Sequence, residues 1–136
     1  MNRLVAILAS LSLTGCVAAP AREVRAVEPG VEVTLAPGEA MSAKTTEMTV
    51  RFIAVTEDSR CPRDVTCIWA GEVKVQLEIQ ETRKASSKVE ILEGGSTVVG
   101  AHRVTLVRVS PQPVSTSRIA PQDYRATLKT DQVETP

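Results

Sequence analysis

Hydrophobic and polar residues alternate with a period of two along most of this chain. The clearest run extends from Val73 to Gln80, where every odd-numbered residue is apolar and every even-numbered residue is polar. Such alternation is typical of a β-strand with one buried face, whereas a helix would distribute these polar residues around its circumference. Similar but shorter runs predict further strands at 31–35, 48–55, 88–92, 104–109 and 124–128.

The alternation slips by one residue in two of these runs. Val55 falls on the face opposite Val50 and Phe52, and the run 104–109 shows the same slip at its end. One extra residue in a strand shifts the side chains in this way. We therefore predict two β-bulges, near Ile53–Ala54 and near Val107–Arg108.

Glycine and proline separate the alternating runs and predict the turns. No long stretch has the 3.6-residue period of an amphipathic helix. Short strands joined by frequent turns favour an all-β domain, an antiparallel β-sandwich or, as the alternative, a small barrel. The predicted turns lie at Pro37–Gly38, Gly94–Gly95, Gly100 and the Pro111/Pro113 pair.

The first residues have the pattern of an export signal. Arg3 is their only charge, an apolar run covers residues 4–13, and small residues precede Cys16. That run is too short for a permanent membrane-spanning helix, so residues 1–15 are predicted to be a signal peptide. The final Leu-Thr-Gly-Cys resembles the bacterial lipobox, which implies cleavage before Cys16 and a diacylglycerol on its thiol. An ordinary secretory signal, cut at residues 18–19, is the alternative.

Removal of this signal leaves 121 of the 136 residues, which suits one domain. Residues 16–30 are rich in alanine, proline and charge, and we predict a flexible tether that follows the lipidated Cys16. Residues 31–136 would then form a single, monomeric β domain that the acyl chains anchor to a membrane. Val17, in place of an aspartate after the lipidated cysteine, favours the outer membrane, with the domain facing the periplasm.

Cysteine usage predicts one disulfide bond. With Cys16 lipidated, Cys61 and Cys67 remain as a pair in an exported protein, where disulfides are the default. Zinc is a poor alternative, because tetrahedral sites need four ligands and His102 is the only histidine.

Composition argues against several classes of function. The 16 basic and 16 acidic residues balance, and three aromatic residues cannot form a base-stacking platform, so we expect no nucleic-acid partner. His102 has no serine or cysteine motif near it, and no phosphate-binding glycine loop is present. The chain is therefore predicted to be non-enzymatic, with no cofactor and no metal.

The stretch EDSRCPRDVTCIWAGEVKVQL, residues 57–77, is similar to a signature of small bacterial exported proteins, many of them lipoproteins. Their motif is D-S-R-C-P, four residues, C, one residue, W-A-G and an alternating strand. The match is close over residues 57–71 and loose over the rest of the domain. That group has no established activity, so the resemblance implies compartment and fold but no catalytic residue.

This stretch also holds the candidate binding residues, Asp58, Arg60, Arg63, Asp64 and Trp69. Trp69 lies two positions after Cys67, so on a strand it would share a face with that cysteine and pack over the disulfide in the core. A binding-surface anchor is the alternative role for this indole.

The charged residues of the stretch allow a structural and two functional interpretations. Arg60 can pair with Asp58, Glu57 or Asp64 and form a scaffold. Arg60 and Arg63, displayed on the braced loop, could instead bind an acidic partner. Calcium held by the three carboxylates is disfavoured, because the regular spacing of a calcium loop is absent and the arginines add positive charge.

These patterns together predict a lipid-anchored protein of the bacterial cell envelope that acts as a binding or structural accessory module. Its expected partner is an envelope protein or polysaccharide. The alternative is a lipoprotein that binds a small ligand or calcium through the acidic disulfide loop.

Overall fold

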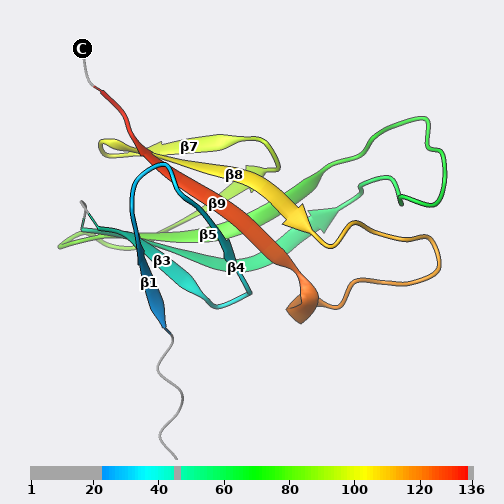
Figure 1. Cartoon of the computed structure of the whole chain (residues 1–136), viewed down its shortest axis with the longest axis horizontal. Coiled ribbons are helices and arrows are strands. Elements are labelled where there is room, and N and C mark those ends of the chain that lie inside the picture. Colours follow the sequence, from blue (N-terminus) through cyan, green and yellow to red (C-terminus); the bar gives the residue numbers. More distant parts are fainter. Residues whose placement is uncertain (1–22, 45–46, 135–136) are drawn as a thin grey trace, which may run out of the picture.

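Two β-sheets packed face to face form the domain (Figure 1). The computed structural model describes residues 23–44 and 47–134. One sheet has the strand order β1-β3-β4-β5-β6 and the other β2-β9-β8-β7. The elements are β1 (Val24–Val27), β2 (Glu32–Leu35), β3 (Ala40–Ala43), β4 (Met48–Asp58), β5 (Val73–Glu81), β6 (Ser87–Leu92), β7 (Ser96–Val99), β8 (His102–Ser110), the 3-10 helix η1 (Pro121–Asp123) and β9 (Arg125–Gln132).

The predicted fold class is confirmed. The described chain is all-β, its two sheets form an open sandwich that does not close into a barrel, and one disulfide joins Cys61 to Cys67. Neighbouring strands are antiparallel, except that β1 runs parallel to β3. The alternation pattern does not predict β1, β3 and β7, because their residues do not alternate between polar and apolar, unlike those of the equally short β2.

Burial alternates along β5 as the sequence predicts. Val73, Val75, Leu77 and Ile79 are buried, and the polar residues between them are at least partly exposed. The facing sheet contributes buried aliphatic residues from β8 and β9, and on β9 burial does not alternate, since Thr127 is buried between Ala126 and Leu128. Phe52 is the one aromatic side chain among the buried residues that the structure describes, so aliphatic packing forms the core.

Both predicted bulges are confirmed by shifts in strand register. The β4–β5 pairing shifts between Phe52 and Ala54, and the β8–β9 pairing shifts between Leu106 and Arg108. A third irregularity, between Val55 and Glu57, was not signalled by the sequence because the residues after Val55 are polar. These bulges keep the apolar side chains of long strands on the core face.

The domain begins earlier than the expected end of the tether at residue 30. Val24–Val27 forms β1 and pairs with β3, and Val27 packs against the core. In a short edge strand that exposes most of its residues, apolar and polar residues need not alternate. For this reason the composition of residues 16–30 predicted a tether and not a strand. The predicted signal peptide and the lipidation site Cys16 lie outside the described residues.

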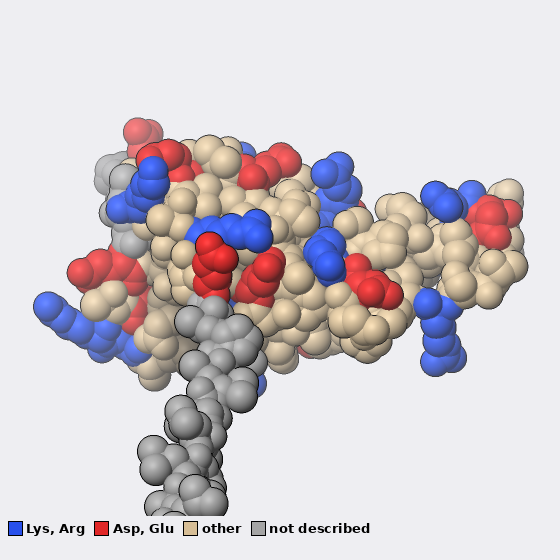
Figure 2. All heavy atoms as spheres, turned by 60° about the horizontal axis from the view of Figure 1, so that its bottom comes forward, with Lys and Arg blue, Asp and Glu red and all other residues tan. Residues whose placement is uncertain are grey.

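Two loops project together from one end of the sandwich. The disulfide loop (residues 59–72) joins β4 to β5, and the proline loop (residues 111–120) joins β8 to β9. Figure 1 shows them side by side beyond the strands, and we call the pair the arm. In the space-filling view of Figure 2 the arm is a narrow, largely uncharged projection that carries a few charged side chains. All five candidate binding residues lie on the arm or at its base.

Candidate functional site

An ion pair between Asp58 and Arg60 holds the base of the arm. Arg60 donates from Nε to Asp58 at 2.8 Å and from Nη2 at 2.7 Å. Its guanidinium also donates to the backbone carbonyls of Val109 (2.7 Å) and Pro111 (3.0 Å), and the Tyr124 hydroxyl donates to Asp58 at 3.0 Å. One side chain therefore joins the end of β4 to the end of β8 and the start of the proline loop.

The Arg60 side chain is only 8% exposed and that of Asp58 10%. Burial alone would raise the pKa of Asp58, but hydrogen bonds from Arg60 and Tyr124 outweigh it and hold that pKa below its ordinary value. The hydrogen bond to Asp58 in turn raises the pKa of Arg60, and burial raises that of Tyr124. The predicted pairing of Arg60 with Asp58 is confirmed, whereas the display of Arg60 for recognition was wrong, because its donors are already used inside the protein.

The two loops are also joined further out. The backbone N–H of Arg63 donates to the carbonyl of Pro113 at 3.0 Å. The Asp64 carboxylate accepts hydrogen bonds from the backbone N–H and the hydroxyl of Ser115, which lower its pKa. Asp64 thus acts as a link between the two loops.

The root of the disulfide loop continues the β4–β5 hairpin. Beyond the last strand pair, Ser59 N–H donates to the carbonyl of Glu72 at 2.8 Å, and Cys61 N–H donates to that of Ala70 at 2.9 Å. Gly71 makes this close approach feasible, because its φ is +70° and an added Cβ would lie 1.9 Å from the Ser59 carbonyl oxygen.

The disulfide closes the outer part of this loop. Cys61 and Cys67 have a Cα–Cα distance of 5.9 Å, and the bond encloses a ring of seven residues. On the chain-entropy model, loss of such a ring costs about 2 kcal/mol. We expect the double variant Cys61→Ser/Cys67→Ser to lose about that much unfolding free energy in a denaturant titration and to keep its fold. Complete unfolding would show that the bond holds more than the loop.

Trp69 departs from its predicted burial. It is 82% exposed, its neighbour Ile68 is 97% exposed, and Val65 on the same loop is 45% exposed. The prediction of a buried indole assumed that a strand follows Cys67 directly, whereas β5 begins only at Val73 and the intervening residues are loop. The alternative role as a surface anchor is the one that this position allows.

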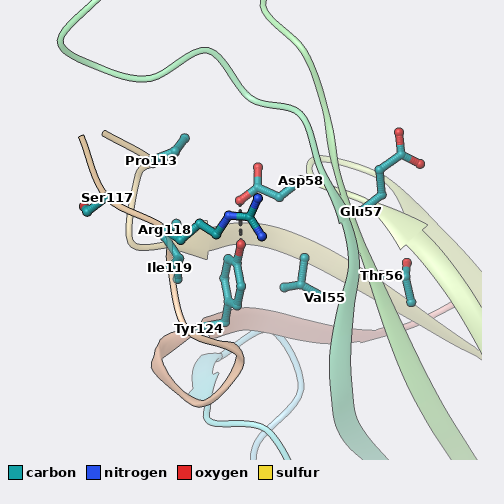
Figure 3. Close-up of a pocket in the computed structure, with 9 residues that line it drawn as sticks. All are labelled: Val55, Thr56, Glu57, Asp58, Pro113, Ser117, Arg118, Ile119 and Tyr124. Carbon is teal, nitrogen blue, oxygen red and sulfur yellow. Dashed lines mark hydrogen bonds between the residues drawn. The ribbon is translucent and has the colours of Figure 1, made fainter. Parts of the chain in front are cut away.

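A pocket opens where the arm meets the sandwich. It has a volume of about 320 Å³ and lies between the end of β4, the proline loop and Tyr124. Figure 3 shows Arg118 extending across this pocket in the direction of Asp58 and the Tyr124 hydroxyl. Val55, Pro113 and Ile119 supply its apolar lining.

Sequence reasoning missed three residues of this region: Ser115, Arg118 and Tyr124. They follow the candidate motif by about fifty residues and lie in the connection between β8 and β9 of the other sheet, so only the packing of the two sheets brings them to it. The available signal was the proline-rich turn between two predicted strands, which indicated a long loop but not its neighbours.

The three carboxylates of the calcium alternative take separate partners. Glu57 pairs with Lys74 at 2.7 Å, Asp58 with Arg60, and Asp64 with Ser115. Over residues 23–44 and 47–134, no group of three or more His, Cys, Asp or Glu side chains is arranged to hold a metal ion. Within the same ranges no helix has the length and apolarity needed to cross a membrane.

Comparison of the chain with protein-family models, curated proteins and solved structures found no match in any of the three.

Proposed function

We propose that the protein is a lipid-anchored, non-enzymatic module of the bacterial cell envelope that docks a protein partner through the tip of its arm. The observation that carries this proposal is the exposure of Ile68 and Trp69, 97% and 82%, on a loop that several interactions brace. The anchor would be the lipid on Cys16, in the outer membrane and facing the periplasm.

The arm has the properties of a prepared binding surface. Complete burial of one large apolar side chain stabilises a folded protein or a complex by about 1.5–3 kcal/mol. Burial of Ile68 and Trp69 by a partner would therefore contribute to the binding free energy. Tryptophan is among the residues most enriched at interface hot spots. The disulfide, the Asp58–Arg60 pair and the Asp64–Ser115 link reduce the entropy lost when the loop is immobilised by a partner.

Two substitutions test whether the tip binds and does not support the fold. In Ile68→Ser/Trp69→Ser, the unfolding free energy should change by only about 0.5 kcal/mol, because both side chains are exposed. Affinity for the partner should fall by more than about tenfold, as expected for a hot spot. Denaturant titration measures the first quantity and calorimetry with the identified partner the second.

The partner can be identified by photo-crosslinking in the native cell. A photoreactive residue at position 69 should give one defined protein adduct, and a matched probe at Val98, an exposed apolar residue on β7, should not. The purified partner should then shift the ¹⁹F resonance of fluorotryptophan at Trp69, which reports on this site alone because the chain has one tryptophan. Equal adducts from both probes, adducts with polysaccharide, or an unchanged resonance would contradict the proposal.

A further inference from the structure

We infer that Arg63 and Arg118 together bind a carboxylate of an acidic polypeptide segment in the docked partner. This inference rests on the proposed function and specifies the partner's chemistry. A pocket of about 290 Å³ lies between the disulfide loop and the proline loop, and both arginines line it. Arg63 comes from the disulfide loop, and Arg118 and most of the other lining residues come from the proline loop.

Both guanidinium groups are available to a ligand. Arg63 and Arg118 are exposed, and neither side chain makes a hydrogen bond or ion pair with the residues that the structure describes. Arg60, three residues before Arg63, is the contrasting case, because its buried guanidinium already donates to Asp58 and two carbonyls. Arg118 therefore takes the place that the sequence pattern assigned to Arg60.

The backbone of Arg63 is held in place, and its side chain, whose charge helps to lower the pKa of Asp64, makes no hydrogen bond or ion pair with the described residues. Its backbone N–H is bonded to Pro113 and the next residue, Asp64, is bonded to Ser115. Ser117 and Arg118 follow in the same proline loop, with a β-bridge between Val114 and Ser117. Both arginines line this pocket, and an arginine fork suits a carboxylate, which accepts paired N–H donors in one plane.

The remaining lining of the pocket indicates a ligand that has apolar and hydrogen-bonding groups in addition to a negative charge. Pro111, Val114 and Ile119 add apolar surface, and Gln112 and Ser117 add hydrogen-bonding groups. Asp123 also lines the pocket, so its charged side chains sum to plus one. A single carboxylate next to an apolar side chain, as in a glutamate- and leucine-containing segment, fits this combination.

The same charges argue against an anionic lipid surface as the occupant. Attraction to such a surface grows with each basic residue near it and requires a cluster of several. The arm offers Arg63 and Arg118, and the carboxylates of Asp64 and Asp123 lie on the same two loops or directly after them. A polypeptide with one well-placed carboxylate needs only the local pair.

The test uses the folded domain labelled with ¹⁵N and a capped, tryptophan-free peptide that alternates glutamate and leucine. Saturable shifts of the Nε–Hε resonances of Arg63 and Arg118 are expected, at concentrations up to about 10 mM for an isolated segment. The matched peptide with glutamine in place of glutamate should bind at least about tenfold more weakly, because a charge-assisted hydrogen bond is lost. Arg63→Gln and Arg118→Gln should each weaken binding to a similar extent.

Arg103→Gln is the matched control variant, because Arg103 is also exposed and without a side-chain partner but lies on β8. It should bind the acidic peptide as the wild type does. Equal shifts with the glutamine peptide, an equal effect of Arg103→Gln, or binding only to vesicles that contain phosphatidylglycerol would overturn the inference.

The outcome also separates this inference from the proposed function. An adduct from position 69 that persists in Arg63→Gln/Arg118→Gln would leave the docking role intact and refute the carboxylate site. Loss of that adduct in the double arginine variant, but not in Arg103→Gln, would support both. Absence of any specific adduct would refute the docking role itself, whether or not the acidic peptide binds.

Discussion

Replacing Arg60 with leucine is expected to lower the free energy of unfolding by about 3 kcal/mol, the lower end of the range for a buried ion pair that loses one partner. The Asp58 carboxylate would keep the hydrogen bond from Tyr124 but lose both donors of the guanidinium. The carbonyls of Val109 and Pro111 would lose a donor as well. Denaturant unfolding at neutral pH measures the effect.

Arg63→Leu is the matched control, because it removes the same type of side chain from an exposed position where that side chain makes no hydrogen bond or ion pair with the described residues. Its effect should stay within about 0.5 kcal/mol. If the two variants lost equal stability, the Asp58–Arg60 pair would contribute nothing to the fold, and the argument for a braced arm would lose its strongest element.

The difference between wild type and Arg60→Leu should also depend on pH. The pKa of Asp58 in the folded protein lies below its unfolded value of about 3.9, so the pair contributes its full stability above about pH 4. That contribution is lost as the pH falls through the folded-state pKa. The two unfolding curves should therefore converge below about pH 4, and a gap that stays constant to pH 2 would assign the stability to the carbonyl contacts instead.

Most of the sandwich could be predicted because apolar and polar residues alternate along its long strands. Each apolar residue of β5 points to the core and each polar residue to solvent, so the alternation in the sequence directly predicts which residues of β5 are buried. The bulges in β4 and β8 were equally visible, because a slip in parity has one geometric cause. The short strands β1 and β3 show no such alternation, so they can be recognised only from the strands with which they pair in the structure.

The arm could be predicted only in part, because its residues follow no period. The disulfide followed from the cysteine count and the predicted export, and the pairing of Arg60 with Asp58 from their nearness in sequence. The exposure of Trp69 was not predictable in this way, since a loop does not fix the side on which a side chain lies. Arg118 enters the site because the proline loop lies beside the end of β4, a neighbourhood that a single sequence does not disclose.

Replacing Gly71 with alanine should damage the root of the arm more than any other glycine-to-alanine change that the structure describes. The new Cβ would meet backbone atoms, the Ser59 oxygen at 1.9 Å and its carbonyl carbon at 2.5 Å, so no side-chain movement can relieve the clash. The left-handed φ of +70° adds strain of about 1–2 kcal/mol. Separating the two segments also breaks two backbone hydrogen bonds, at about 1 kcal/mol each, for a total loss of about 3–4 kcal/mol.

Gly38→Ala isolates the clash from the strain. Gly38 also has a left-handed φ, +88°, but an added Cβ there would have nothing within 4 Å, so this variant should lose only about 1–2 kcal/mol. Denaturant titration compares the two, and amide exchange at Ser59 and Cys61 shows whether the damage in Gly71→Ala is confined to the root of the arm. Equal losses of unfolding free energy in the two variants would mean that the backbone segments at the root of the arm can separate with little loss of stability. Ile68 and Trp69 would then sit on a loop that a partner must still order, and the expected affinity of the tip would fall accordingly.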